Sequence, residues 1–529
     1  MNETDASLRY GSDNLSLPSY LTNFSIMGIY LPAIFFTIAV YSTFNNRQTI
    51  KAPYVGYRAW FEPTFLLKLR FVNGARSGNP SYKYAVLIRD EQFKDSIFVV
   101  RRNDIDIAVI SNKYLDEVRL LSTAKLSSVQ AQVKNLLGKY TYTTVMLESN
   151  LHVRVLQNQL TPNLDMYLDR ASVELEFALG KDIKRPEAWT VVDIQSIVRT
   201  IVSRMSAVVF LGHPACRDEA WLKLSVDFSI NIFNTSFTMR MFPPFMHPLL
   251  ALVLPARYRV RRNLDAAEKI ITPLIEEHQR RRVQGSLGSD ESTEETLLTW
   301  MLDNAKGDEA LPAKMASRQL ILTLASIHTT SMAVSHALYD LCAHPEWFEP
   351  LRGEIEETLQ GQQLGNGHLP RLEKLDSFLA ESQRFNPPIL LSPQRLVMQP
   401  LLFRDGTRLS TGTRVAFASA DILMDPSVTP NPRIFDPMRS YRKRRGQEEG
   451  HRHLFGQTDK DHLMFGHGKQ TCPGRLFAVA EIKMVLARFL LDWEFEYPQG
   501  KSRPTNFFLD EMVFPDPSAK LMIKERVRN

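Results

Sequence analysis

The chain has 529 residues, of which 44% are hydrophobic and 23% are charged, as is ordinary for a globular protein with a sizeable core. Its net charge of +6 is mild and its basic residues are scattered, which argues against nucleic acid and favours an anionic membrane face or an acidic protein partner. The three cysteines exclude a disulfide framework and suit a catalytic portion kept in reducing cytosol. The length allows several domains, or one large domain plus an anchor.

An uncharged apolar run near the N-terminus predicts a transmembrane signal anchor. Ile26–Phe44 has 19 residues and would extend about 28 Å as a helix, close to the hydrocarbon thickness of a bilayer. A cleaved signal peptide is the alternative, but it would begin with basic residues, whereas Glu3, Asp5 and Asp13 precede this run. We therefore expect a tail over 1–25, a membrane span over 26–44 and a large domain over 45–529.

The charges that flank this span predict its orientation. Basic residues follow it at Arg47, Lys51, Arg58 and Lys68, which places the C-terminal side in the cytosol. On the other side, Asn2 and Asn14 begin acceptor sequences for glycosylation, as a lumenal tail and a glycoprotein would carry. The pattern predicts a single-pass protein with a cytosolic catalytic domain.

The chain then passes from short strand-like runs to helical periodicity. Tyr84–Ile88 and Ser96–Val100 have the apolar character of strands, and Leu151–Gly180 and Val191–Phe210 repeat apolar residues at helical spacing. Gln284–Thr296 is rich in Gly, Ser and Glu without periodicity, which predicts an exposed linker.

A second apolar run, Phe242–Leu254, is broken by three prolines and is too short to span a bilayer. It has two interpretations. One is a buried core segment. The other is a segment dipping into a membrane surface, with nearby arginines at the headgroups, namely Arg257, Arg259, Arg261 and Arg262.

The stretch Phe465–Arg475 carries the strongest chemical signal. Cys472 lies among glycines, which permit tight turns and close approach to a flat group, and an apolar helical pattern follows it. The start of a helix favours a thiolate over a thiol. A thiolate on such a loop, with Phe465 nearby, suits one axial bond to a haem iron. The alternative is a buried free cysteine beside a helix cap.

This stretch, closed by Ala478, fits F-x-x-G-x-x-x-C-x-G-x-x-x-A and resembles the haem-binding loop of the cytochrome P-450 monooxygenases. The resemblance implies that Cys472 is the only metal ligand from the chain. It assigns further cofactor contacts to Phe465, Gly468, Lys469, Gly474 and Arg395. Lys469 is included because Gln470 stands where the family commonly has a charged residue facing a haem propionate. In many members of the family, a Trp and an Arg about four residues apart contact the haem propionates. This chain has no such pair, and His152 and Arg154 are only weak substitutes for it.

A long helical pattern over Ala313–Leu341 has a centre, Ala325–Thr330, that resembles the family's oxygen-activation motif A-G-x-(D/E)-T-(T/S). Thr329 matches the threonine that takes part in proton delivery, while His328 replaces the usual acid and Ser326 the usual glycine. Histidine can relay protons near neutral pH. The plainer alternatives are a core histidine and a threonine bonded to a carbonyl one turn earlier.

Glu381 and Arg384 resemble the family's E-x-x-R motif, with Arg439 as a third member. Their three-residue spacing puts them on one helix face, where an ordinary surface ion pair is the alternative. Buried, they would form a structural clamp that holds the sequence ahead of the cysteine loop. Nearby, Ile389, Leu390 and Leu391 should line a substrate cavity, and Leu401–Phe417 alternates around a hairpin turn at Asp405 and Gly406.

The resemblance covers about residues 50–525. It implies a mainly α fold with small β-sheets, a single haem domain behind one transmembrane helix, and a haem b cofactor. It implies an NADPH- and O2-dependent monooxygenase in the endoplasmic reticulum membrane that takes electrons from NADPH-cytochrome P-450 reductase. The closest resemblance is to fungal biosynthetic members, which implies an apolar substrate such as a terpenoid or meroterpenoid. Two alternatives are a haem-thiolate isomerase or dehydratase without a reductase, and a membrane interaction protein with a vestigial site.

Overall fold

In the computed structural model, the described residues are 52–55, 95–102, 104–242, 244–284 and 294–527. All of them belong to one compact unit, Thr49–Asn529. The predicted membrane span Ile26–Phe44 and the strand-like run Tyr84–Ile88 lie outside the described residues, as do the predicted tail and its glycosylation sequences.

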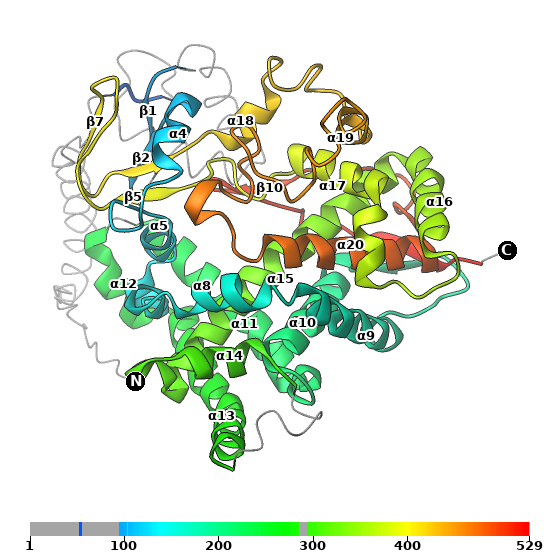
Figure 1. The fold of residues 1–529 in the computed structure, drawn as a ribbon, viewed down its shortest axis with the longest axis horizontal. Helices are drawn as coiled ribbons and strands as arrows, with labels where there is room; N and C mark the ends of the chain where they lie inside the picture. Colours follow the sequence, from blue (N-terminus) through cyan, green and yellow to red (C-terminus); the bar gives the residue numbers. More distant parts are fainter. Residues whose placement is uncertain (1–51, 56–94, 103, 243, 285–293, 528–529) are drawn as a thin grey trace, which may run out of the picture. The chain divides into compact units, whose positions relative to one another are not determined.

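Helices make up most of the unit (Figure 1). The long ones are α9 Leu164–Asp182, α10 Ile194–Leu211, α11 Glu219–Arg240, α13 Pro255–Val283, α15 Pro312–Ala343, α16 Phe348–Leu359, α17 Glu373–Phe385 and α20 Arg475–Asp492. The shorter ones are α4 Leu115–Val118, α5 Ser128–Asn135, α6 Gly138–Thr141, α7 Val145–Glu148, α8 Leu151–Val155, α12 His247–Val253, α14 Leu297–Asn304, α18 Ser419–Met424 and α19 Arg439–Lys443.

The central element is α15, which packs against α10, α11, α13, α17 and α20. Most of its side chains are buried on every side, as expected of a helix that runs through the core of a large domain. The helix predicted over Ala313–Leu341 is therefore confirmed. In Figure 1, α20 runs beside α15.

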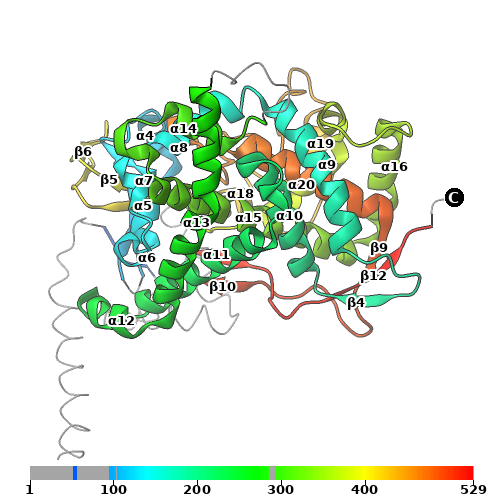
Figure 2. The same cartoon turned by 90° about the horizontal axis from the view of Figure 1, so that it is seen from below.

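Small sheets lie at two ends of this helical body (Figures 1 and 2). A five-stranded sheet has the order β1-β2-β8-β5-β3, with β2 and β8 parallel and the other pairs antiparallel. Its strands are β1 Phe98–Arg101, β2 Asp106–Val109, β8 Arg414–Ala416, β5 Arg395–Val397 and β3 Leu126–Ser127. A three-stranded sheet contains β4 Thr190–Val192, β12 Leu521–Glu525 and β9 Trp493–Glu496. The predicted mainly α fold with small sheets is confirmed.

Two hairpins complete the strands, β6 Leu401–Leu402 with β7 Arg408–Leu409, and β10 Phe507–Leu509 with β11 Met512–Phe514. The first is the predicted hairpin, with Leu401 opposite Leu409 and Gly406 at φ +85° in the turn. The helix predicted from Val191 begins later than expected. Val191 lies in β4, and α10 starts after Asp193, whose carboxylate accepts a hydrogen bond from the Ser196 N–H.

Two apolar segments differ in exposure. Among the described residues, α10 is the one helix long and apolar enough to cross a bilayer, but it is mostly buried against α9 and α15 and is a core helix. The segment η4 Pro244–Met246 with α12 is the opposite, because Phe245, Leu249, Leu252 and Val253 are 47%, 66%, 66% and 72% exposed. The interpretation of Phe242–Leu254 as a core segment is therefore wrong. These side chains form an apolar surface, which we call the α12 surface.

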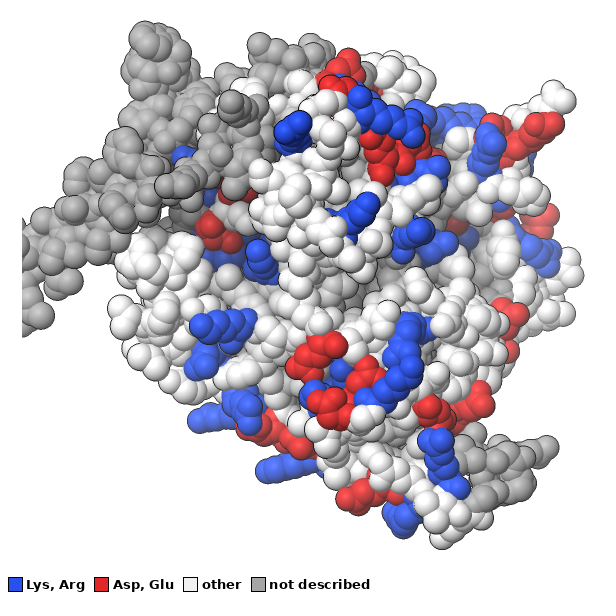
Figure 3. Space-filling view, turned by 60° about the vertical axis from the view of Figure 1, so that its left-hand side comes forward, with Lys and Arg blue, Asp and Glu red and all other residues white. Residues whose placement is uncertain are grey.

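Charge is mixed on the face shown in Figure 3, where Lys and Arg side chains alternate with Asp and Glu over a mostly uncharged surface. No extended basic track crosses that face. The scattered charge seen in the sequence therefore stays scattered there in the fold, unlike the continuous basic patch of a nucleic-acid-binding surface.

Candidate active site

The loop before α20 is built by glycines and short backbone hydrogen bonds. The Gly466 N–H donates to the Leu463 carbonyl at 2.9 Å, and the Cys472 N–H donates to the Phe465 carbonyl at 2.8 Å. Gly468 adopts φ +77°, and a Cβ there would lie 2.1 Å from the Arg119 carbonyl oxygen. A side chain at 468 is therefore excluded by the chain itself. The turn delivers Cys472 two residues before the Gly474 cap of α20.

The Cys472 thiol has a different electrostatic environment from the other two cysteines. Burial raises the pKa of all three thiols. At Cys216 and Cys342 nearby carboxylates raise the pKa further, and at Cys216 the Arg217 charge opposes them. At Cys472 no carboxylate adds to burial, and the Gly474 N–H and the Arg475 charge oppose it. Cys472 is thus the thiol of the three without a nearby carboxylate, although burial still raises its pKa.

Neighbouring elements hold this loop in place. The Lys469 N–H donates to the Arg119 carbonyl at 2.9 Å, while the Lys469 side chain is exposed. The Gln470 side chain accepts from the Ser128 N–H at 2.8 Å and donates to the Leu126 carbonyl at 2.7 Å. The amide of Gln470 therefore fixes the loop to β3 and the start of α5, a role that no sequence pattern indicates.

Arg395, on β5, is a buried cation with no anion among the described residues. Its guanidinium donates to two carbonyls, of Gln394 at 2.9 Å and of Gln470 at 3.3 Å, and the residue is 7% exposed. Burial without a countercharge lowers the pKa of Arg395 to about 10. A buried guanidinium of this kind is costly unless an acidic group pairs with it. Arg395 therefore fits a ligand carboxylate next to the cysteine loop.

The middle of α15 opens on one face. Ala325 and Thr329 are exposed, and their four-residue spacing puts them one above the other. Ser326 and His328 beside them are half-buried, whereas Leu324, Ile327 and Thr330 are buried. The Thr329 hydroxyl donates to the Ala325 carbonyl at 2.9 Å, which is the back-bonded arrangement allowed as the alternative for this residue. The hydroxyl oxygen still lies on the open face, where its lone pairs can accept.

His328 is held neutral. Burial lowers its pKa to about 4, and the Arg199 charge adds to this effect. Its ring meets the edge of Phe233 at 5.5 Å between centroids, and its Nε2 has no hydrogen-bond partner among the described residues. At neutral pH it can therefore donate only as a neutral N–H, because the imidazolium form is disfavoured.

Aromatic side chains continue from His328 along α11 to β11. Phe233 stacks on Phe237 at 5.7 Å, and Phe237 meets Phe514 edge to face at 6.4 Å. All three rings are half-buried. We call this series the aromatic wall, and its flat apolar surface suits a rigid apolar molecule.

Of the three residues expected to line the cavity, Leu391 does not. It is fully buried in the core of the five-stranded sheet with Phe98 and Val109. Leu390 packs with Val513, and Ile389 pairs with Met512 at the edge of β11. The prediction failed for Leu391 because the bend before β5 turns this side chain into the apolar cluster of the sheet.

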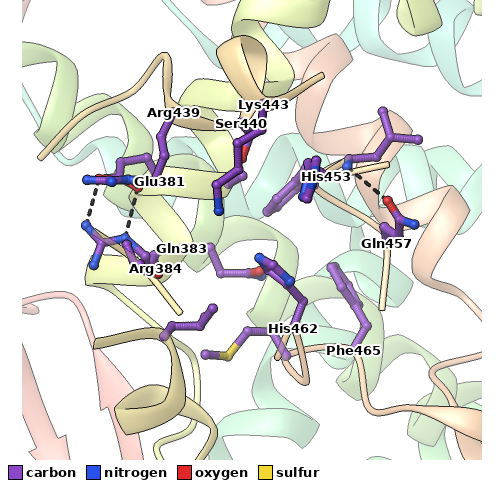
Figure 4. A pocket seen from close by; sticks show the side chains of 16 residues that line it. Glu381, Gln383, Arg384, Arg439, Ser440, Lys443, His453, Gln457, His462 and Phe465 are labelled. Carbon is purple, nitrogen blue, oxygen red and sulfur yellow. Dashed lines mark hydrogen bonds and ion pairs between the residues drawn. The ribbon is translucent and has the colours of Figure 1, made fainter. Parts of the chain in front are cut away.

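The predicted clamp residues lie together (Figure 4). The Glu381 carboxylate accepts from Arg384 Nε and Nη2 at 2.9 and 2.7 Å and from the Asp436 N–H at 2.8 Å, and Arg439 Nε lies 3.5 Å away. Arg384 also donates to the Pro432 carbonyl at 2.6 Å. Glu381 is 3% exposed, so a surface ion pair is excluded, and the contacts join α17 to the segment that leads toward the cysteine loop.

The hollow drawn in Figure 4 lies beside this clamp, and Phe465 forms part of its lining. Its other lining side chains are mostly polar, including Glu381, Arg384, His453 and His462. An apolar substrate is therefore better served by the aromatic wall and the open face of α15 than by this hollow.

Taken together, the residues fit a haem. Cys472 offers sulfur, Arg395 offers a cation that lacks an anion, and a Cβ at Gly474 would meet no protein atom within 4 Å. The two substitutes for the missing Trp and Arg pair contribute less. His152 is buried with a pKa lowered to about 4 by burial, and Arg154 lies 3.8 Å from Glu309.

Two polar residues that sequence reasoning missed, Ser206 and Glu481, meet Ser326 where α10, α15 and α20 cross. Ser206 Oγ lies 2.6 Å from Ser326 Oγ, and the Ser206 hydroxyl donates to Glu481 Oε1 at 3.1 Å. The one sequence signal is an acid in the apolar helical pattern that follows Cys472, since Glu481 stands between Ala480 and Ile482.

A second group of possible metal ligands lies away from this site. Cys216 Sγ is 3.2 Å from His213 Nδ1, and Glu174 completes the group. Arg217 already pairs with Glu174 at 2.9 Å, so a cation bound there would face a guanidinium. The group is better described as an ion pair beside a hydrogen-bonded thiol.

Comparison with known proteins agrees with this geometry. The family model described as cytochrome P-450 matches residues 108–523. A cytochrome P-450 monooxygenase of Emericella nidulans is 46% identical over 494 residues, which cover 93% of this chain and 90% of that protein. An ent-kaurene oxidase of Gibberella intermedia is 41% identical over 488 residues, covering 91% and 89%. A cyanobacterial protein solved with retinoic acid bound has a similar fold, with a TM-score of 0.61 at 21% identity over 87% of this chain and 96% of that chain.

Proposed function

The chain belongs to the cytochrome P-450 monooxygenase family, and from that premise we propose that it is an NADPH- and O2-dependent haem-thiolate enzyme that oxidises a terpenoid or meroterpenoid of fungal secondary metabolism. The observation that carries the proposal is that the buried Arg395 guanidinium, which has no acidic partner among the described residues, contacts the Cys472 loop through the Gln470 carbonyl. The substrate class is supported by the apolar aromatic wall and by the similarity to a relative named ent-kaurene oxidase.

Different residues of the chain would hold the cofactor, transfer protons and orient the substrate. Cys472 would bind the iron of haem b, Arg395 would pair with a propionate, and Gly474 leaves room for the flat ring. A bound haem would supply the oxygen-activating chemistry. Thr329 holds a hydroxyl on the open face and passes protons there, with His328 as a neutral donor behind it. The aromatic wall orients the substrate and keeps water out.

Electrons come from outside the chain in this proposal. The sequence contains no flavin or nicotinamide motif, and members of the family generally need a redox partner. A membrane-bound NADPH-cytochrome P-450 reductase in the endoplasmic reticulum fits the predicted anchor and the cytosolic domain. An enzyme that needed neither NADPH nor O2 would instead be the isomerase or dehydratase considered above.

The test of the haem-thiolate assignment is a ligand spectrum. Reduced protein under carbon monoxide should show the strongly red-shifted Soret band of thiolate-bound haem, and Cys472→Ser should abolish it. Cys216→Ser and Cys342→Ser are matched controls that should keep the band, because both thiols lie near carboxylates that raise their pKa. A Cys472→Ser variant that retained the band would overturn the assignment.

The substrate class has its own test. The full chain and a reductase are expressed in a host that accumulates candidate terpenoids, and oxygenated products are measured with and without NADPH in isolated membranes. We expect new products that require NADPH and O2. Products formed without either would support the isomerase or dehydratase, and an absence of products from every terpenoid tested would reject the substrate class.

We also propose that the α12 surface is a second membrane contact, in addition to the predicted anchor. Four large apolar side chains are exposed on it, and full burial of each contributes about 1.5–3 kcal/mol. Deleting residues 1–45 should therefore leave much of the protein on sedimented membranes. Changing Leu249 and Leu252 to Gln in the truncated chain should release it. A truncated protein that is wholly soluble and monomeric before this change would remove the α12 surface from the proposal.

A further inference from the structure

Three side chains from distant parts of the sequence form a polar chain through an apolar core. Ser326 on α15 contacts Ser206 on α10, and Ser206 contacts Glu481 on α20, at 2.6 and 3.1 Å. Ser206 and Glu481 are 0% exposed. Ser326 is half-buried, so one end of the chain lies in the core and the other reaches toward the open face of α15.

Glu481 lacks the partners that a buried carboxylate needs. Its Oε2 has no hydrogen bond among the described residues, and no cation acts on it there. Two residues further along α20, Lys483 shows the usual solution, because its ammonium pairs with Asp376 at 2.6 Å. Burial raises the pKa of Glu481 to about 8, opposed only by the Ser206 hydroxyl. At neutral pH Glu481 is therefore a carboxylic acid that holds a proton.

The other end of the chain is next to the proposed reaction site. Ser326 directly follows Ala325, whose carbonyl accepts from the Thr329 hydroxyl at 2.9 Å. Ser326 also stands where the family's motif has a glycine, which has no hydroxyl. The polar chain therefore ends beside Thr329 because of a residue in which this sequence departs from the motif.

We propose that Glu481, Ser206 and Ser326 form a proton relay from the core of the three-helix crossing to the open face of α15. It rests on the proposed monooxygenase function and adds a second proton route beside Thr329. Ser206 and Ser326 act here as relay residues, and Glu481 is the proton store.

The transfer needs one proton acceptor on the open face, a water molecule or the Thr329 hydroxyl, and no other reactant. The Ser206 hydroxyl, which donates to Glu481 Oε1 in the structure, first turns to donate to Ser326 Oγ, so that the Glu481 carboxyl can donate to Ser206 Oγ across the same 3.1 Å contact. The O–H bond of the Glu481 carboxyl then breaks as its proton moves to Ser206 Oγ. The original Ser206 proton moves to Ser326 Oγ, and the original Ser326 proton moves to an acceptor on the open face. Each hydroxyl loses one proton and gains one, and Glu481 is left as a carboxylate until a proton returns along the same chain. Both serine oxygens can donate and accept, which this exchange requires.

A purely structural role explains the contacts less well. Burying a carboxyl group with one hydrogen bond is unfavourable, and an apolar side chain would pack in its place without that cost. A group that stores a proton has to be an acid in a dry environment, where its pKa is raised toward the working pH. The observed burial and single partner match the second requirement.

The test uses the full-length holoenzyme in membranes with a reductase, and three variants, Glu481→Gln, Ser206→Ala and Ser326→Ala. Two controls remove buried serine hydroxyls from the same helices. Ser203→Ala removes a hydroxyl bonded to the Arg199 carbonyl on α10, and Ser335→Ala removes one bonded to the Ser331 carbonyl on α15. The carbon monoxide spectrum is recorded for every protein, so that loss of haem is not mistaken for loss of proton transfer.

The first readout is independent of turnover. The infrared spectrum of purified wild type minus that of Glu481→Gln, at neutral pH, should contain one carbonyl stretch of a protonated carboxyl that moves in D2O. Ser206→Ala should shift that band because it removes the hydrogen bond. Absence of the band from the wild type would overturn the proposal, since Glu481 would then hold no proton.

The second readout is product formed per NADPH consumed. General acids contribute roughly 100-fold or more to a reaction, and a route shared with Thr329 should carry less, so each relay variant should lose about threefold to tenfold. A Glu481→Gln and Ser326→Ala double variant should lose no more than the worse single one. Unchanged coupling in the relay variants, or equal losses in Ser203→Ala and Ser335→Ala, would overturn the relay. A wild type without the thiolate band would instead reject the proposed function.

Discussion

Two buried glutamates, Glu381 and Glu481, differ in how many partners their carboxyl groups have. Glu381 accepts two hydrogen bonds from Arg384 and one from the Asp436 N–H, and Arg439 lies within 3.5 Å. Glu481 has a single serine and an oxygen without a partner among the described residues. The first group is satisfied and ties elements together, whereas the second is left able to exchange a proton.

The same contrast extends to their surroundings. Near the clamp, Asp376 pairs with Lys483 at 2.6 Å and accepts from the Phe455 N–H at 2.9 Å. In the middle of α15, His328 Nε2 and the Thr330 hydroxyl are buried without hydrogen-bond partners among the described residues. Unsatisfied buried polar groups are rare in folded proteins. Such atoms also occur elsewhere among the described residues, including Arg439 Nε at the clamp, so their number does not distinguish the middle of α15. What distinguishes it is that an imidazole and a hydroxyl, both able to exchange protons, lie next to Thr329.

The largest effect should come from removing Glu381, the carboxylate that has a full set of hydrogen-bond and charge partners. Glu381→Ala leaves Arg384 and Arg439 facing each other in a buried site, which should cost about 3–5 kcal/mol. We expect a large fall in melting temperature and loss of the carbon monoxide band, because the segment before the cysteine loop is released. Both are measured on membranes from matched expression levels.

Glu373→Gln is the control on the same helix. Glu373 pairs with Arg444 and Arg445 but is partly exposed, so its loss should cost about 1 kcal/mol or less. If Glu381→Ala were as stable as Glu373→Gln and kept its band, the clamp would not be what holds this region.

The clamp around Glu381 could be predicted from sequence much better than the surroundings of Glu481 and His328. Three-residue spacing placed Glu381 and Arg384 on one helix face, and the structure puts them in contact. The cysteine loop and the long helix over Ala313–Leu341 were likewise foreseeable, because each rests on local spacing that one segment fixes by itself.

The surroundings of Glu481 and His328 depend instead on packing between residues that are far apart in the sequence. Ser206 and Glu481 are 275 positions apart, and nothing in either helix tells which residues will meet where α10, α15 and α20 cross. The neutral state of His328 follows from burial against Phe233 on a third helix, α11, which sequence periodicity does not supply. Leu391 was misplaced for a similar reason, since it lies in a bend whose direction depends on packing against residues far away in the sequence, such as Phe98 and Val109.

The pH dependence of stability distinguishes Glu481 from Glu381 and should give the second largest effect. The pKa of Glu481 is raised from its ordinary value of 4.5 to about 8 by burial. Between these values the folded protein keeps a proton that the unfolded chain has released, so stability falls as pH rises through this window. Glu481→Gln removes the dependence and should gain stability relative to wild type, by up to about 3–5 kcal/mol between pH 5 and pH 8.

Thermal unfolding of the wild type and Glu481→Gln at pH 5, 6, 7 and 8 measures this difference. Glu381→Gln is the informative counterpart, because it should be less stable than wild type at pH 8. A Glu481→Gln variant whose stability tracked the wild type at every pH would mean that Glu481 is ionised in the fold, as a satisfied carboxylate would be.

The smallest expected effect concerns His328, which tests whether an unsatisfied side chain beside Thr329 takes part in proton delivery. His328→Ala should leave the carbon monoxide band and substrate binding intact while product per NADPH falls about threefold and peroxide rises, since a positioned proton donor is lost. His328→Asp should retain more coupling than His328→Ala, because the Arg199 charge that lowers the pKa of His328 would favour a carboxylate there.

Thr329→Ala should uncouple as well, and the double variant should lose little beyond the worse single one, because residues of one relay are not additive. The pKa of about 4 adds a condition, since His328 stays neutral from pH 6 to pH 8 and its contribution should not change over that range. Product and peroxide per NADPH, measured across those pH values, decide the matter. Full coupling in His328→Ala would make the histidine a packing residue against Phe233, and Glu481 with its serines would remain as the proton source on this side of α15.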